Sequence, residues 1–128
     1  MKSRDTLVRL KRFQAEEKRR RVLQIETMIA EFSRMAGDLD REIAAEEQRS
    51  GVADPTHFAY STYARAARTR RDNLHLSAED LRSQLDAAKA RYDEAAEELT
   101  KVQSIDLRDK NVDVVRERAD MPVRAVRF

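Results

Sequence analysis

The two halves of this chain each carry a stripe of apolar residues that recurs at alternating steps of three and four. The first stripe runs from Val22 to Ile43, and the second runs from Leu74 to Val102. A mean step of about 3.5 residues keeps one side of an α-helix facing a partner helix. The stripes are separated by a break at residues 50–55, Ser-Gly-Val-Ala-Asp-Pro. The sequence therefore predicts an all-α fold, a long antiparallel two-helix coiled-coil hairpin.

The composition agrees with a fold that buries only a narrow stripe. Of 128 residues, 39% are charged, and there are only two glycines and two prolines. Such a chain is too polar for a large globular core, and the regular apolar spacing argues against disorder. No run approaches the roughly 18 to 20 apolar residues of a membrane span, and no apolar stretch follows the basic start. We expect a cytoplasmic protein.

The charges select the same pairing of the two halves as the apolar residues do. If the chain reverses near Val52, basic residues of 9–21 lie beside acidic residues of 86–98, and acidic residues of 38–47 beside basic residues of 65–71. Flanking charges of this kind set orientation in coiled coils. The expected apolar pairs are Leu39 with Ala67, Phe32 with Leu74, Ile25 with Leu81 and Val22 with Leu85. Because the seam is used internally, we expect a monomer.

Local signals set the expected boundaries. Ser3 is a candidate N-cap of the first helix, and Asp54-Pro55 combines a capping carboxylate with a proline at the first helical position. The expected organisation is a hairpin at 1–110, with helices at about 4–49 and 55–110 and a turn at 50–54, followed by a flexible tail at 111–128 that is partly helical or disordered.

Three aromatic residues, Phe58, Tyr60 and Tyr63, follow the break. On a helix Phe58 and Tyr60 lie about 200 degrees apart, so at least one of the three is expected to be exposed. These rings either close the end of the hairpin or form a partner-binding patch, since exposed aromatic residues are favoured anchors at interfaces.

Signs of catalysis or of metal binding are missing from the sequence. His57 and His75 stand apart, there is no cysteine, and no glycine-rich phosphate loop occurs. We expect a protein that is not an enzyme and has no cofactor and no metal. The basic block at 16–21 is similar to the basic region of a DNA-binding zipper, but it lacks an asparagine to read adenine and faces acidic residues. Nucleic acid is therefore not an expected partner.

Three segments together resemble the FliJ family of flagellar type III export proteins. They are Met1-Lys-Ser-Arg-Asp-Thr-Leu-Val-Arg-Leu-Lys-Arg-Phe13, Glu17-Lys-Arg-Arg-Arg-Val22 and Phe58-Ala-Tyr-Ser-Thr-Tyr63. The resemblance covers about residues 1–110. It implies an antiparallel two-helix coiled coil that looks like the rotor stalk of rotary ATPases.

The resemblance also implies partners and contact residues. The hairpin's terminal end would insert into the hexameric ring of the export ATPase, through Arg4, Arg9, Lys11 and Arg12. Phe58, Tyr60 and Tyr63 would contact the cytoplasmic domain of the export gate, and export chaperones would also bind. The protein would associate peripherally with the flagellar basal body and meet the membrane only through the export apparatus. The alternatives are a general export chaperone that holds secretion substrates and, further behind, a nucleic-acid-binding coiled coil.

Overall fold

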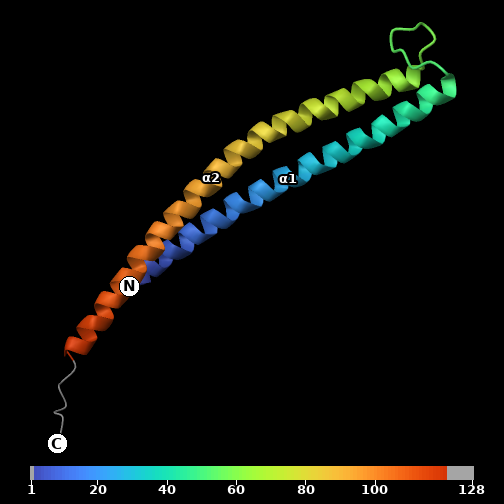
Figure 1. Cartoon of the computed structure of the whole chain (residues 1–128). Coiled ribbons are helices and arrows are strands. Elements are labelled where there is room, and N and C mark those ends of the chain that lie inside the picture. The colour runs from blue at the N-terminus through green and yellow to red at the C-terminus, as the bar shows by residue number, and fades with distance from the viewer. Residues whose placement is uncertain (1, 121–128) are drawn as a thin grey trace, which may run out of the picture. The chain divides into compact units, whose positions relative to one another are not determined.

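The computed structural model describes residues 2–120 and contains two helices in that range, α1 (Lys2–Ser50) and α2 (Thr62–Asp120), joined by a loop at 51–61 (Figure 1). The chain divides into two compact units. We call Arg20–Ala90 the loop unit, and Met1–Arg19 with Arg91–Phe128 the terminal unit. In each unit a stretch of α1 packs antiparallel to a stretch of α2, which confirms the predicted all-α hairpin.

Two apolar clusters hold the loop unit together. One contains Ile25, Leu81 and Ala88, with Val22, Ile29, Phe32 and Leu85 packed around it. The other contains Leu39, Ile43 and Ala67, with Leu74 packed against it. Three of the four expected pairs therefore share a cluster. Phe32 packs against the first cluster and Leu74 against the second.

The end of α1 and the loop follow ordinary capping rules. Gly51 has a positive φ of 76°, and its N–H donates to the carbonyl of Glu47 at 2.9 Å. A left-handed glycine directly after the last helical residue is a common helix stop, because glycine has no Cβ to clash there. The break predicted at residue 50 is confirmed.

The predicted start of the second helix at residue 55 is wrong. Asp54 does accept a backbone N–H, from Thr56 at 2.9 Å, but this bond closes a short turn, in which the N–H of His57 also donates to the Asp54 carbonyl at 3.1 Å. An aspartate before a proline favours such a turn as well as it favours a helix N-terminus. The turn is not extended, and α2 begins at Thr62.

Ser61 is the residue that caps α2. Its Oγ accepts the N–H of Ala64 at 3.2 Å, as an N-cap serine does, and its hydroxyl donates to Oε1 of Glu46 at 2.9 Å. The cap of α2 is thus also tied to the last turns of α1.

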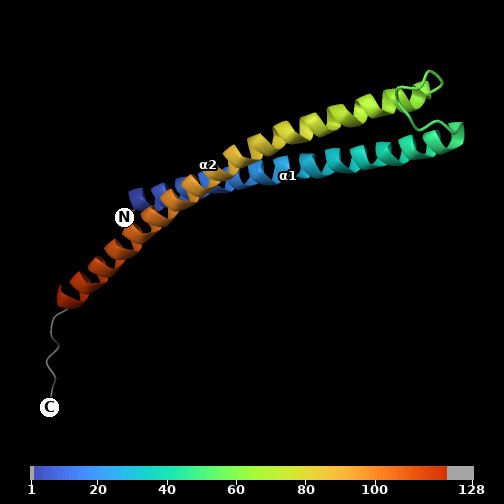
Figure 2. The same cartoon turned by 45° about the horizontal axis from the view of Figure 1, so that its top comes forward.

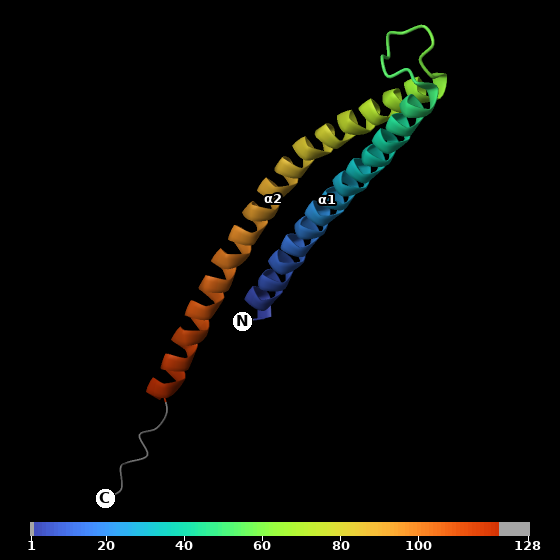
Figure 3. The ribbon, with the colours of Figure 1, turned by 45° about the vertical axis from the view of Figure 1, so that its right-hand side comes forward.

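The terminal unit is built on fewer buried apolar residues. On α1, Val8 and Ala15 are buried, and on α2 a charged residue, Asp106, occupies a buried position. Figures 2 and 3 show α2 continuing past the start of α1. The helix extends to Asp120, so 111–120 is helical and its side chains are exposed, whereas 121–128 of the predicted tail lies outside the described residues. Neither helix in the described range has the length and apolar character needed to cross a bilayer.

Candidate partner-binding surfaces

The three aromatic residues near the loop have different roles. Tyr60 is only 4% exposed, and its hydroxyl donates to Oε1 of Glu47 at 3.0 Å. The guanidinium of Arg65 lies 5.6 Å from the centre of the Tyr60 ring. Tyr60 therefore closes the end of the apolar seam, one of the two roles considered for these rings.

Phe58 and Tyr63 are exposed, as expected for at least one of the three. The Phe58 side chain is 94% exposed and stacks on the ring of His57, with centroids 4.6 Å apart. The hydroxyl of Tyr63 donates to Oε2 of Glu42 at 3.0 Å, and this bond to a carboxylate raises the pKa of the phenol. Phe58 is thus an aromatic ring on the loop with nearly all of its surface available to a partner.

The four basic residues expected at the terminal end fall into two pairs. Arg4 forms an ion pair with Asp109, and Nζ of Lys11 lies 3.0 Å from Oε2 of Glu98. Both pairs join α1 to α2, so these two cations help to hold the unit together. The sequence alone could not separate them from their neighbours, because all four lie within the same basic segment.

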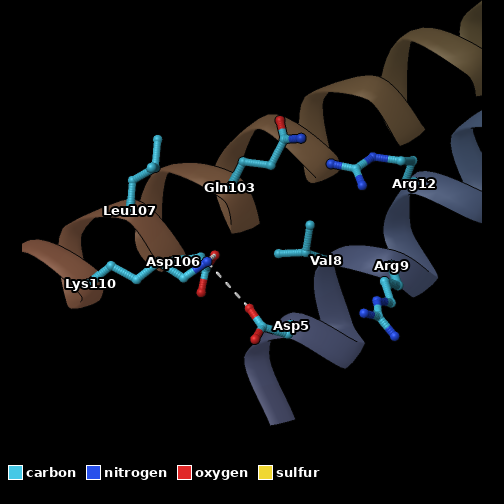
Figure 4. Close-up of a pocket in the computed structure, with 8 residues that line it drawn as sticks. All are labelled: Asp5, Val8, Arg9, Arg12, Gln103, Asp106, Leu107 and Lys110. Atoms are coloured by element: carbon cyan, nitrogen blue, oxygen red, sulfur yellow. Dashed lines mark ion pairs between the residues drawn. The ribbon is translucent and has the colours of Figure 1, made fainter. Parts of the chain in front are cut away.

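Arg9 and Arg12 form no ion pair with any residue in the described range. They line a shallow depression between α1 and α2, which Figure 4 shows. In that view the Arg12 guanidinium reaches toward α2, whereas Arg9 points away from it. The other lining residues are Asp5, Val8, Gln103, Asp106, Leu107 and Lys110.

Asp106 and Lys110 form a network in this depression that the sequence reasoning missed. Nζ of Lys110 lies 3.0 Å from Oδ2 of Asp106 and 3.5 Å from Oδ1 of Asp5 across the two helices. The bond to Asp106, together with the charges of both carboxylates, raises the pKa of Lys110. The missed signal was the seam spacing, because 99, 102, 106 and 109 continue the steps of three and four through two aspartates.

These surfaces can bind a partner through side-chain contacts and through pairing of opposite charges. The depression is open and lined by ion-paired or free charges. Among residues 2–120, no group of three or more histidine, aspartate or glutamate side chains is placed to hold a metal ion. Of the contact residues that the resemblance implied, Phe58 and Tyr63 are exposed rings of the loop unit, and Arg9 and Arg12 are arginines of the terminal unit without an ion-pair partner in the described range.

Comparisons with known proteins add no assignment: no family model matches the chain, and no curated protein or solved structure matches it either.

Proposed function

We propose that this chain is a non-catalytic stalk and coupling protein of a flagellar type III export apparatus, which binds the export ATPase ring and the export gate. The observation that carries the proposal is that exposed contact residues of two different kinds lie in two separate units. Arg9 and Arg12 are unpaired cations on the terminal unit, and Phe58 is an exposed ring on the loop unit. The resemblance of the three sequence segments to the FliJ family supports the same assignment.

The side-chain environments refine which residues make these contacts. On the terminal unit, Arg9 and Arg12 meet the ATPase ring, while Arg4 and Lys11 keep the two helices paired. On the loop unit, Phe58 is the main anchor for the gate, and Tyr63 adds a half-exposed ring beside Glu42. Export chaperones are further partners, and the protein works in the cytoplasm at the basal body.

The proposal is tested by adding the purified chain to the hexameric export ATPase and measuring ATP turnover. Turnover should rise, and the double variant Arg9→Glu/Arg12→Glu should lose the stimulation because both unpaired cations are reversed. Arg34→Glu/Arg82→Glu is the matched control, since it reverses two exposed arginines of the loop unit. Unchanged turnover together with no co-purification would rule out the stalk.

The gate contact needs its own measurement. Phe58→Ala should weaken binding to the gate's cytoplasmic domain, because truncating an exposed aromatic anchor removes most of its contact area. Tyr60→Phe is the variant for comparison, because it removes only the Tyr60 hydroxyl, which donates to Glu47, and leaves the Phe58 ring in place. If Phe58→Ala and the unmodified chain bound the gate domain with equal affinity, Phe58 would not be part of the gate contact.

A further inference from the structure

The terminal unit has two long edges where α1 and α2 meet, and they differ in chemistry. In heptad terms the buried seam residues Val8, Ala15 and Asp106 are a positions, and e and g positions flank the seam. In an antiparallel pair the e positions of both helices meet at one edge. The ion pair between Asp5 and Lys110, both e positions, marks that edge, which also carries Arg12 and Gln103 in the depression of Figure 4.

The g positions meet at the opposite edge. Gln14, Arg91 and Glu98, all g positions, line a second shallow depression together, which places this edge in the structure. The hydrogen bond between the g residues Tyr63 and Glu42 shows the same geometry within the loop unit. The register therefore puts Leu7 of α1 opposite Ile105 of α2 on the g edge of the terminal unit.

This g edge carries an apolar strip with nothing packed over it in the described structure. The strip consists of Leu7, Leu10, Ile105 and Val112, whose side chains are 40% to 49% exposed. Leu7, Ile105 and Val112 are g positions, and Leu10 is the adjoining c position on α1. A helix pair that exposes leucine and isoleucine beside its own seam presents an apolar face against which the apolar face of another helix can pack.

The charges beside the strip select the kind of helix. On α2 the c positions next to the strip are Lys101 and Arg108, one heptad apart and both basic. Arg108 has no ion-pair partner among residues 2–120, whereas Nζ of Lys101 lies 3.5 Å from Glu97. A helix with acidic residues one heptad apart along its flank would pair with both. A second copy docked symmetrically through the same strip would instead set Arg108 and Lys101 against the same cations.

We propose that the g edge of the terminal unit binds an amphipathic helix with an acidic flank from another protein, which packs between α1 and α2 as the third helix of a bundle. The site is formed by Leu7, Leu10, Ile105 and Val112, with Arg108 setting the orientation. The proposal does not depend on the flagellar assignment, because Arg12 lies on the opposite edge and Arg9 points away from α2.

The test uses the full chain and two synthetic peptides about three heptads long, both with leucine at a and d. One peptide has glutamate at e and g, and the other has lysine there. The glutamate peptide should bind, measured by fluorescence anisotropy, and the lysine peptide should bind at least about tenfold more weakly. Leu10→Asp and Ile105→Asp should each weaken binding about tenfold or more, because each puts a charge into the strip that the bound peptide would bury.

Two controls establish whether the peptide binds at the g edge of the terminal unit. Leu76→Asp changes a leucine of the loop unit that is 64% exposed, and it should leave binding unchanged. Arg9→Glu/Arg12→Glu should also leave peptide binding unchanged, so the two proposals fail independently. Arg108→Glu should reduce the preference for the glutamate peptide, because only Lys101 remains to pair with it, and a purely apolar contact would not show this change.

Four outcomes would overturn the proposal. They are no binding of either peptide, equal binding of both, unchanged affinity in Leu10→Asp, and an occupant of another kind. The last would be a dimer in analytical ultracentrifugation that Leu10→Asp converts to monomer, or binding to phosphatidylglycerol vesicles that the same variant abolishes.

Discussion

The loop unit and the terminal unit use one heptad spacing with different side chains. In the loop unit most seam positions are apolar, Ile25, Leu39 and Leu81 among them, and two apolar clusters result. One charged residue, Arg71, also lies at a seam position there and pairs with Asp40. In the terminal unit the same spacing places Lys11 and Asp106 at seam positions, and both are ion paired. The spacing determines that two helices pair, whereas the residues at the spaced positions determine how firmly they pair.

The difference has an energetic meaning. Burying an aliphatic side chain contributes about 1.5 to 3 kcal/mol, whereas an exposed ion pair contributes between 0 and about 1 kcal/mol. The terminal unit buries Val8 and Ala15 on α1 and joins its helices through Arg4–Asp109, Lys11–Glu98 and Asp5–Lys110. It should therefore open locally before the loop unit unfolds.

The largest effect is expected from shortening a buried side chain of the loop unit. Ile25 is 1% exposed and lies in the cluster with Leu81 and Ala88. Ile25→Ala should lower the free energy of unfolding by about 3 kcal/mol, because it removes apolar contacts and leaves a cavity. Urea denaturation followed by circular dichroism measures it, with the exposed Leu76→Ala as control. A loss no larger than that of the control would mean that this cluster does not anchor the loop unit.

A smaller, opposite effect is expected from making the terminal seam apolar. Asp106→Leu should stabilise the terminal unit by about 1 kcal/mol, because a buried charge is replaced by a side chain that can pack against Val8. Native-state hydrogen exchange of amides in 2–19 and 91–110 reports this change. Asp113→Leu is the matched control, as it changes the seam position one heptad later, where the side chains of α2 are exposed. Faster exchange in Asp106→Leu would show that the Lys110 network holds the unit.

Salt should distinguish the two units by a still smaller amount. Raising sodium chloride from low concentration to about 1 M screens charges beyond about 3 Å. Amide exchange in the terminal unit should then accelerate about threefold, while the protected amides around Ile25 and Leu81 stay unchanged. Hydrogen exchange with mass spectrometry resolves both units in one sample. Equal acceleration in the two units would mean that their seams do not differ in charge dependence.

The sequence predicted the pairing of the helices well, but it predicted the start of α2 wrongly, because local capping sets that boundary. The spacing of Ile25, Leu39 and Leu81 carries long-range information, because one face of a helix must stay buried over many turns. The start of α2 depended on a choice between Asp54 and Ser61. Both are good caps, and Ser61 combines its capping bond with one to Glu46 on the other helix.

The sequence predicted which types of residue would contact partners, aromatic and basic, but not which individual residues are free to do so. Sequence alone placed Tyr60 with Phe58 and Arg4 with Arg9. Whether an aromatic or basic residue is free depends on its partner from the other helix, and those partners lie at sequence separations of 13 for Tyr60 and 105 for Arg4. If charged residues had been accepted at seam positions, the pattern would have extended through Asp106. It would then have predicted how α1 and α2 pair in the terminal unit.

The smallest predicted effect concerns alkaline pH. The pKa of Lys110 is raised above its ordinary value of 10.5, mainly by the hydrogen bond to Asp106. Its contribution to stability is therefore complete below about pH 10.5 and is lost as the pH rises through the raised pKa. In the loop unit the pKa of Tyr63 is also raised above its ordinary 10.0, so its contribution to stability is likewise lost as the pH rises. The apolar seam there remains intact when the phenol ionises.

Methyl NMR of Val8 and Ile25 can compare the two units directly. Above about pH 10.5 the Val8 methyl signals should shift as the neutral Lys110 releases Asp106 and Asp5, while those of Ile25 should stay in place. Lys110→Arg is the control, because arginine keeps its charge at this pH and should hold the Val8 signals steady. Val8 signals that shift equally in Lys110→Arg would assign the alkaline change to a group other than Lys110. If the Ile25 signals also shifted over the same pH range, packing in the loop unit would depend on a titrating group as well. The proposed difference between the two seams would then be wrong.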